Sequence, residues 1–374
     1  MKYYIIAGEA SGDLHASNLM KALKARDPQA DFRCWGGDLM EQAGGDVVKH
    51  YKELAFMGFW EVFTNLNTIF RNMRICQVDM LLYEPDAVIL VDYPGFNLRM
   101  AKFAKEQGFK VIYYISPQIW AWKKGRIKKI KKYVDEMMVI LPFEEEFYAK
   151  NGMKVRYVGH PLLDAVSKDL HDSQDVLDFR RQHGMDDREI VALLPGSRKQ
   201  EISAILPQML KMVPLFPQYQ FVVSVVEWQS RSLYEKFLKK SDVKTVSGSA
   251  YPLLANAKAA VVASGTATLE TAMIGTPQVV CYAGSELSYI IAKQLISGIH
   301  FISLPNLIMD KQVVTELIQH DFNTFHLRKE LEKITGDEAY LATLKEDYRQ
   351  LYALLGDGSA SAKAADVVME AMKR

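Results

Sequence analysis

The chain has 374 residues, of which 49% are hydrophobic and 24% charged, and its formal net charge is +1. This composition excludes a disordered chain, and the net charge excludes a partner that is selected by overall charge alone. The three cysteines, Cys34, Cys76 and Cys281, form no C-x-x-C pair, which argues against a disulfide framework or zinc site and fits a reducing cytosol. We expect no signal peptide, no membrane-spanning run and, from the length, two domains.

The first half of the chain alternates short apolar runs with helical periodicity. The runs that predict strands are 3–8, 87–92, 110–116 and 136–142. They are apolar at nearly every position and therefore predict a parallel sheet with helices on both faces. The turn after the first strand contains Gly8 and Gly12, but their spacing departs from the G-x-G-x-x-G dinucleotide fingerprint. Glu9 and Asp13 in the same turn would also repel a phosphate.

Residues 54–75 carry a broad apolar stripe with arginines behind it. Its members include Phe59, Trp60, Phe63, Leu66 and Phe70. The stripe is either a buried core helix or a helix that binds acyl chains or dips into a membrane. Seven of the ten residues at 123–132 are lysine or arginine. Such a run is typical of a solvated helix face, of nucleic-acid binding or of an anionic lipid surface, and it favours the membrane alternative for the stripe.

Asp92 ends the apolar strand at 87–92 and precedes a Pro-Gly turn. A carboxylate at the carboxyl end of a buried strand points toward a ligand cleft and can act as a general base. The alternative is an aspartate that only caps the turn. Asn97 is predicted to cap the helix that follows.

The alternation of strands and helices starts again after a polar connection at 167–189. The predicted strands are 189–197, 220–226, 243–247, 259–264 and 278–283. The simplest architecture is a pair of Rossmann-like halves with a cleft between them, where ligands bind beyond the carboxyl ends of the strands.

The turn Pro195-Gly196-Ser197-Arg198 follows the first strand of the second half. Gly196 lets a ligand approach the backbone, Ser197 can donate a hydrogen bond and Arg198 can pair with an anion. The start of the next helix adds free N–H groups. The alternative is an ordinary turn with a capping serine.

A second turn of this kind contains the small residues Ser264, Gly265, Thr266 and Ala267 and opens another helix. Its backbone N–H groups suit a diphosphate, and Glu270, one turn later, can accept hydrogen bonds from ribose hydroxyls. Two such turns in one half favour a nucleoside diphosphate. The turn has no Walker lysine, which argues against a P-loop NTPase.

The tail predicts two helices, and the last one is expected to return to the first domain. We therefore expect an α/β protein of the doubly wound kind. Its expected divisions are a first domain at 1–166, a second at 167–345 and a C-terminal helical segment at 346–374.

Nine segments, in order, closely resemble the lipid-A-disaccharide synthases, a family of inverting glycosyltransferases with the GT-B fold. They are GEASGDLHASNLMKAL, LAFMGFWEV, VDYPGFN, YYISPQIWAW, LPFEEEFY, YVGHPLLD, LLPGSRKQEI, ASGTATLE and SLPNLI. The resemblance extends from residue 3 to about 320.

The resemblance implies a reaction. UDP-2,3-diacylglucosamine donates its sugar to the 6-hydroxyl of 2,3-diacylglucosamine 1-phosphate (lipid X), which yields a β-1,6 tetraacyl disaccharide 1-phosphate and UDP. It further implies no cofactor or bound metal, no nucleic-acid partner, and a cytoplasmic enzyme bound peripherally to the anionic inner membrane. The resemblance leaves the oligomeric state open, as either a monomer or a homodimer.

The resemblance also implies roles in the first domain, which would bind the acceptor. Asp92 matches an essential acid of the family and is expected to be the general base. Some members carry a second acid where this chain has Gly95, which leaves Glu9 as the rival base. In the opening turn, Glu9, Ser11 and Asp13 would accept hydrogen bonds from sugar hydroxyls, and the glycines at 8 and 12 would let the backbone come close.

In the second domain, the resemblance implies that Arg198 neutralises the UDP diphosphate. Asn306 matches an asparagine that is important for activity, and Glu316 and Gln319 match positions that contact the nucleotide. Two alternatives stay open. One is a UDP-sugar 2-epimerase of the same architecture, and the other is a non-catalytic module that binds a membrane surface or RNA.

Overall fold

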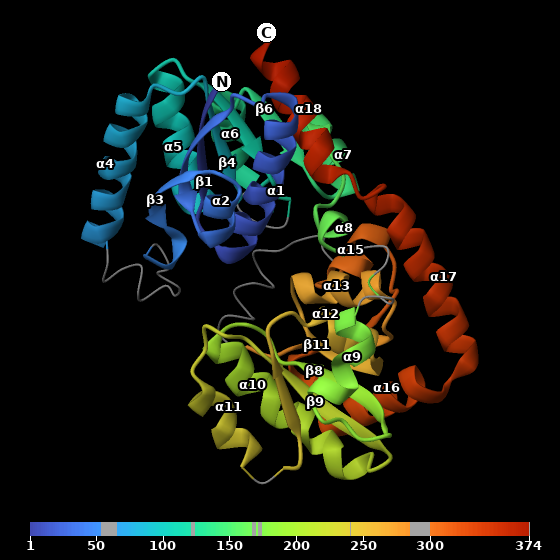
Figure 1. Cartoon of the computed structure of the whole chain (residues 1–374). Helices are drawn as coiled ribbons and strands as arrows, with labels where there is room; N and C mark the ends of the chain where they lie inside the picture. The colour runs from blue at the N-terminus through green and yellow to red at the C-terminus, as the bar shows by residue number, and fades with distance from the viewer. Residues whose placement is uncertain are drawn as a thin grey trace. The chain divides into compact units, whose positions relative to one another are not determined.

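The computed structural model describes residues 1–53, 66–120, 124–166, 170, 174–239, 241–284 and 300–373. The chain forms two compact units: unit 1 is Met1–Asp164 with Leu355–Arg374, and unit 2 is Ala165–Leu354. Each unit is built on one parallel sheet (Figure 1), which confirms the predicted α/β class. Unit 2 extends past the predicted boundary at 345, because helix α17 (Glu338–Leu355) is continuous and belongs to unit 2 up to Leu354.

Unit 1 contains a seven-stranded sheet in the order β3-β2-β1-β4-β5-β6-β7, and every pair is parallel. The strands are β1 (Lys2–Ala7), β2 (Asp31–Gly36), β3 (Asp46–His50), β4 (Ala87–Val91), β5 (Lys110–Tyr114), β6 (Glu136–Val139) and β7 (Arg156–Tyr157). The helices are α1 (Ala10–Arg26), α2 (Asp38–Gln42), α4 (Leu66–Tyr83), α5 (Pro94–Glu106), α6 (Ile127–Tyr133), α7 (Pro142–Lys150), α8 (Leu162–Ala165) and α18 (Ala360–Met372). Short 3-10 turns lie at Tyr51–Glu53 and Lys124–Arg126.

Alternating side chains of the unit 1 strands fill two separate cores. Along β1, Tyr3 and Ile5 pack on the face covered by α1 and α18, whereas Tyr4 and Ile6 pack on the face covered by α4 and α5. Successive side chains of a strand point to opposite faces, so a strand buried on both faces must be apolar at every position. This explains the unbroken apolar runs in the sequence.

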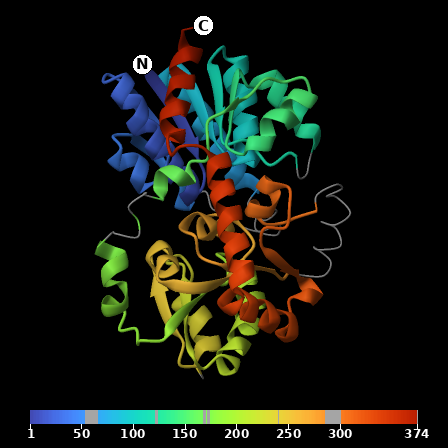
Figure 2. The ribbon, with the colours of Figure 1, turned by 90° about the vertical axis from the view of Figure 1, so that its right-hand side faces the viewer.

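The last helix returns to unit 1, as predicted. Helix α18 lies beside α1 (Figure 2), and its Ala364 and Val368 are fully buried in the core on that face. The Asp164 carboxylate accepts the backbone N–H groups of Ala360 (3.0 Å) and Ser361 (2.8 Å) at the start of the helix. A carboxylate at this end satisfies free N–H groups and complements the helix dipole.

Unit 2 contains a six-stranded parallel sheet in the order β10-β9-β8-β11-β12-β13. The strands are β8 (Glu189–Leu194), β9 (Tyr219–Val225), β10 (Lys244–Ser247), β11 (Ala257–Ala263), β12 (Gln278–Tyr282) and β13 (Thr315–Ile318). Besides α17, the helices are α9 (Gln174–Gln182), α10 (Lys199–Met209), α11 (Arg231–Leu238), α12 (Tyr251–Ala255), α13 (Thr266–Ile274), α15 (Leu304–Met309) and α16 (Thr324–Gly336). Two 3-10 helices follow α10 and β13, at Leu210–Leu215 and Gln319–Asp321.

Candidate functional site

In both sheets the strand order reverses between two central strands. The reversal lies between β1 and β4 in unit 1 and between β8 and β11 in unit 2. Loops leave such neighbouring strands toward opposite faces, so a crevice opens at the carboxyl ends, where ligands bind in open α/β sheets. Glu9 and Asp92 follow β1 and β4, and the turns at 195–198 and 264–267 follow β8 and β11. The predicted turns therefore occupy the reversal point of each unit.

Asp92 has the electrostatic properties of a proton acceptor. Its side chain is half-buried, and burial raises the pKa of its carboxyl to about 6, with a smaller contribution from the negative charge of Glu9. A pKa near the working pH suits a general base, because the group is ionised and still binds a proton readily. Glu9, the predicted rival, is exposed.

The backbone of the turn after β4 is strained. Asp92 and Tyr93 are consecutive left-handed residues, with φ of 44° and 47°. Non-glycine residues in this region cost about 1–3 kcal/mol each and are found mainly at functional sites. Tyr93, not Asn97, precedes the first turn of α5, so the predicted N-cap is wrong. Asn97 lies inside the helix and is fully buried.

The opening turn differs from its predicted role at three positions. The Asp13 carboxylate is buried and accepts the backbone N–H groups of Gly37 (2.8 Å), Leu39 (3.1 Å) and Met40 (3.1 Å), so it caps α2 and is not available to a sugar. A Cβ on Gly12 would lie 3.3 Å from the Cβ of Ala7, so this glycine serves the packing of α1 on β1.

Gly8 also has an internal role. A Cβ there would lie 2.3 Å from the ring of Tyr93, so the glycine makes room for that ring and not for a ligand. Of the predicted sugar-binding side chains, Glu9 and Ser11 are exposed at the start of α1.

In unit 2, the turn after β8 is a tight βα turn. Gly196 has φ of 101°, and a Cβ at this position would lie 2.7 Å from Oε2 of Glu201. That oxygen accepts the backbone N–H groups of Ser197 (3.2 Å) and Arg198 (3.3 Å). Glu201 therefore satisfies the N–H groups of the two residues that precede α10, whereas the predicted use of the first N–H groups of the helix itself stays a prediction.

Arg198 is the part of this turn that is available to an anion. Its side chain is 70% exposed, and it pairs with Oε1 of Glu201 at 3.2 Å. An exposed pair of this kind contributes little to stability, so a diphosphate can compete for the guanidinium.

The turn after β11 leaves more of its donors available. Gly265 and Thr266 are exposed, and a Cβ on Gly265 would meet no atom within 4 Å. Thr266 and Ala267 are the first two residues of α13, where N–H groups have no partner within the helix. Ser264 was predicted to contribute as well, but its N–H donates to Cys281 O (2.8 Å) and its hydroxyl to Ile302 O (3.1 Å).

Glu270 lies one turn further along α13. Its side chain is half-buried, and burial raises the pKa of its carboxyl. It accepts a long hydrogen bond from the hydroxyl of Tyr251 at 3.5 Å, so among the described residues most of its capacity as an acceptor is unused.

Asn306 and Glu316 form an internal network. Asn306 is fully buried, and its amide donates to Val314 O (2.9 Å) and to Oε1 of Glu316 (2.8 Å). The Glu316 carboxylate also accepts N–H groups of Ile302 (3.0 Å) and Ser303 (2.9 Å). These bonds occupy both side chains and brace the segment that begins α15, and the predicted catalytic role of Asn306 and nucleotide contact of Glu316 stay predictions.

Gln319 forms a reciprocal pair with a neighbouring loop. Its Nε2 donates to Gly284 O (3.2 Å), and its Oε1 accepts the N–H of Gly284 (2.9 Å). The pair joins the carboxyl ends of β12 and β13. Gln319 is half-buried in this arrangement.

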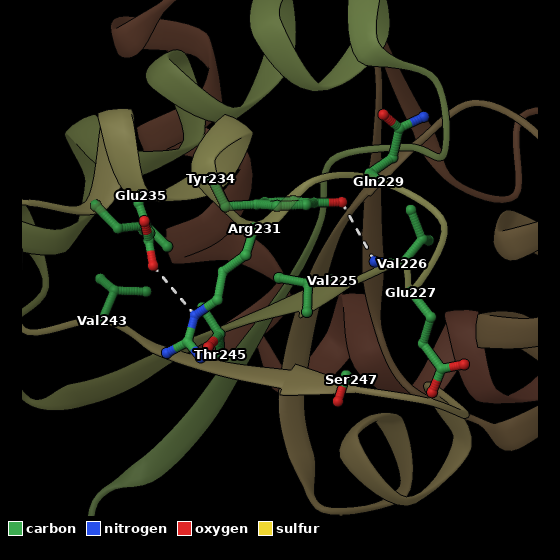
Figure 3. Close-up of a pocket in the computed structure, with 11 residues that line it drawn as sticks. Val225, Val226, Glu227, Gln229, Arg231, Tyr234, Glu235, Val243, Thr245 and Ser247 are labelled. Carbon is green, nitrogen blue, oxygen red and sulfur yellow. Dashed lines mark hydrogen bonds and ion pairs between the residues drawn. The ribbon is translucent and has the colours of Figure 1, made fainter.

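A separate hollow lies beside α11, above β9 and β10 (Figure 3). It has a volume of about 470 Å³ and a floor that includes Val225 and Val243. Arg231 pairs at 3.1 Å with Glu235, one turn further along α11, and the Tyr234 hydroxyl accepts the N–H of Val226 at 3.2 Å. None of the predicted site residues lines it.

Glu144, on α7, is a buried acid that was not predicted from the sequence. Glu144 is 1% exposed, its carboxylate accepts the N–H groups of Leu141 (3.0 Å) and Ile140 (3.2 Å), and burial raises its pKa to about 7. The signal was present, since a glutamate at the third position of a helix, after a proline at its first, is typical of a helix N-terminus.

Of the predicted membrane stripe, Phe59, Trp60 and Phe63 lie outside the described residues. Phe70, on α4, is 60% exposed and not part of a core. In the part of the chain that the structure describes, no helix has the length and hydropathy to cross a bilayer, and no three potential metal ligands lie together.

Comparison with solved structures supports the fold. UDP-N-acetylglucosamine 2-epimerase from Neisseria meningitidis bound to UDP-GlcNAc superimposes with a TM-score of 0.69, at 12% identity, over 99% of this chain and 100% of that chain. A putative enzyme of the same name from Listeria monocytogenes also gives 0.69, at 13% identity, over 100% and 95%. At this identity the likeness shows the GT-B-like fold alone.

Sequence comparison identifies the family. A lipid-A-disaccharide synthase from Syntrophus aciditrophicus is 41% identical and covers 99% of this chain and 97% of its own length. The corresponding synthase from Coxiella burnetii is 38% identical and covers 97% and 96%. The family model described as lipid-A-disaccharide synthetase matches residues 3–369. The chain therefore belongs to the lipid-A-disaccharide synthetase family of glycosyltransferases.

Proposed function

We propose that this chain transfers 2,3-diacylglucosamine from UDP-2,3-diacylglucosamine to the 6-hydroxyl of 2,3-diacylglucosamine 1-phosphate. The products are a β-1,6 disaccharide 1-phosphate and UDP. The observation that carries the proposal is the placement of the predicted turns at the reversal point of each sheet, in a chain that belongs to this family.

In this proposal, unit 1 binds the acceptor and Asp92 is the general base. Its carboxylate takes the proton of the acceptor 6-hydroxyl while that oxygen forms a bond to the anomeric carbon of the donor. The bond from the anomeric carbon to the diphosphate breaks on the opposite side, so the configuration inverts. The raised pKa of Asp92 supports this role. In the same proposal, Glu9 and Ser11 accept hydrogen bonds from sugar hydroxyls, and their exposure supports this.

Unit 2 binds the donor. Arg198 and the first N–H groups of α13, at Thr266 and Ala267, stabilise the negative charge that develops on the leaving diphosphate. Donors that are already oriented toward such a charge stabilise it without reorganisation. Glu270 accepts hydrogen bonds from the ribose. Gly196, Ser197 and Gln319 hold the surrounding loops in place.

The test is a reaction of the purified chain with both diacyl substrates, followed by UDP release and the mass of the lipid product. We expect equimolar UDP and disaccharide, and no product when either lipid is omitted. Incubation with UDP-GlcNAc alone, followed by analysis for UDP-ManNAc, tests the epimerase alternative. Epimerisation without disaccharide formation would overturn the proposal.

We also propose that the enzyme binds peripherally to the anionic cytoplasmic face of an inner membrane through α4. Five of the twelve exposed large apolar side chains in the described part of the chain lie on this helix. They are Phe70, Ile75, Val78, Leu81 and Leu82, and we call them the α4 patch. Their spacing places them on one side of the helix, which forms the outer edge of unit 1 (Figure 1).

The charges of α4 support a lipid surface as the occupant. Arg71 and Arg74 are exposed among the patch residues. Apolar side chains flanked by cations suit an anionic bilayer, because the side chains enter the interface while the cations pair with headgroups.

Flotation with vesicles tests this surface. We expect a Val78→Glu, Leu82→Glu variant to lose binding to vesicles that contain phosphatidylglycerol. A matched variant on unit 2, Leu177→Glu, Phe325→Glu, should bind as the wild type does. Equal flotation of both variants would reject the α4 patch, and a change from dimer to monomer by light scattering would assign it to a second copy of the chain instead.

A further inference from the structure

Two fully buried side chains converge on the backbone oxygen of Asp92. The hydroxyl of Tyr113, on β5, donates to this oxygen at 2.6 Å, and Nδ2 of Asn97, on α5, donates to it at 2.8 Å. The backbone N–H of Asp92 donates to Tyr114 O at 3.0 Å. The backbone N–H and the carbonyl of Asp92, on either side of its Cα, are therefore both held by hydrogen bonds.

The amide of Asn97 can take only one orientation here. Besides Asp92 O, its Nδ2 faces Val91 O (3.2 Å) and Ile6 O (3.3 Å), so an amide oxygen at this position would meet three carbonyls. Its Oδ1 is buried and has no hydrogen-bond partner among the described residues. A buried unsatisfied acceptor is costly, and an apolar side chain of the same size would avoid that cost. The presence of an asparagine despite this cost indicates that its Nδ2 donor has a role of its own.

The strained backbone explains what these donors do. Asp92 and Tyr93 both have positive φ, and such a conformation persists only when the surroundings over-determine it. With the N–H and the carbonyl of Asp92 both fixed, the direction in which its Cβ leaves the backbone is fixed too. The carboxyl then has only its own side-chain rotations left.

We propose that Tyr113 and Asn97 are positioning residues that hold the carbonyl of Asp92, so that its carboxyl meets the acceptor hydroxyl in one orientation. This inference rests on the proposed function, in which Asp92 is the base. Neither residue touches a reacting atom. Both act through the backbone of the turn.

The pH dependence of the reaction reports on this arrangement. The groups that act on the Asp92 carboxyl are Glu9 from the β1–α1 turn and the backbone of Tyr93, and Tyr113 faces it from β5. Arg126 and Tyr148 act on Tyr113 in turn. When the turn is released, the carboxyl gains water and its pKa falls from about 6 toward the ordinary value. The acid limb of the kcat profile should then move to lower pH.

The main test is Tyr113→Phe, which removes one oxygen and keeps the ring. We expect kcat to fall about tenfold, with the KM of both lipid substrates within about twofold and the acid limb at lower pH. Asn97→Leu should have the same effects in the same direction. UDP affinity, measured by calorimetry, should not change in either variant.

The matched control is Tyr348→Phe in unit 2. Its hydroxyl also donates to a backbone carbonyl, Thr276 O at 3.3 Å, and its side chain is buried. It should lose stability and keep the kcat and pH profile of the wild type. If Tyr113→Phe behaves like this control, the positioning role is overturned. If the wild-type protein forms no disaccharide, that result instead contradicts the proposed function. An unchanged KM for the acceptor lipid, which unit 1 binds in this proposal, shows that unit 1 of a slow variant is folded.

Discussion

The turn after β4 in unit 1 and the turns after β8 and β11 in unit 2 occupy equivalent places in two similar sheets, yet their chemistry is opposite. The first has a half-buried carboxyl and strained non-glycine residues. The other two place positive φ on glycines, Gly196 and Gly265, and offer a guanidinium and helix N–H groups. The reversal point of a parallel sheet therefore does not select a charge. The side chains of the turn decide whether it can accept a proton from a ligand or bind an anion.

The turns of the two units also differ in backbone strain. A glycine takes positive φ at little cost, so the turns of unit 2 avoid strain. A glycine at position 92 would avoid it too, but it would remove the carboxyl. In our interpretation, the strain at Asp92 and Tyr93 is retained because the base must stand at that position.

The largest effect should follow from Asp92→Asn. Loss of the base should lower turnover by about 10²–10⁴-fold, since general-base catalysis contributes a factor of this order. UDP affinity should not change, because Arg198 and the α13 N-terminus are intact. UDP release and calorimetry measure the two quantities. Turnover near that of the wild type would transfer the role of base to Glu9, which Glu9→Gln would then test.

The corresponding change in unit 2 is Arg198→Ala. Loss of a charged hydrogen bond to the diphosphate should weaken UDP binding by about 10- to 100-fold. The pH profile of the residual activity should keep its acid limb, because Asp92 is unaffected. Calorimetry with UDP provides the measurement, and Arg181→Ala, on an exposed face of α9, is the control. An unchanged affinity would contradict the assignment of the donor site.

The comparison predicts a stability difference as well. The pKa of Asp92 is raised in the folded state, so its carboxyl favours folding when it is protonated and disfavours folding when it is ionised. Asp92→Asn should therefore raise the free energy of unfolding at pH 8 by about 1–3 kcal/mol.

This gain should shrink as the pH falls through about 6 and disappear below the ordinary pKa of an aspartate. Urea unfolding at a series of pH values tests it, with Asp187→Asn as an exposed control. A gain that is independent of pH would show that the charge of Asp92 is not the cause.

The smallest effect concerns Glu201, which pairs with Arg198 and which, in our proposal, competes with the donor diphosphate for the guanidinium. Glu201→Gln keeps an oxygen for the N–H groups of Ser197 and Arg198 and removes the negative charge beside the guanidinium. UDP affinity should rise by about two- to fivefold, with a weaker dependence on salt. A fall in affinity would mean that the ion pair orients Arg198 for the diphosphate.

Several features could be predicted from the sequence because their signals are local. The apolar run at 87–92 and the polar residue at its end placed Asp92 at the carboxyl end of β4. The small residues at 264–267 located the start of α13, and the glycine at 196 located the tight turn after β8. Each of these depends on residues that are neighbours in the sequence.

Other residues could not be assigned in this way because their partners are distant. Asp13 was expected to face a sugar, but the N–H groups that it accepts belong to a helix that begins 25 residues later. Asn306 and Glu316 were expected to meet a ligand, yet they bond to each other inside unit 2. A polar residue near a ligand-binding loop has the same sequence pattern whether it faces the ligand or the interior.

The amino-acid sequence by itself determined the class of fold, nine of the thirteen strands of the two sheets, the family and the positions of the turns that are predicted to carry the chemistry. Only the tertiary structure decided which polar side chains of those turns are available to a substrate. The reason is physical. Periodicity and turn composition reflect the local backbone, whereas the availability of a carboxylate or an amide depends on whether a distant N–H or carbonyl already satisfies it. For Asp92, Asn97 and Tyr113, that decision came from the packing of α5 and β5 against the end of β4.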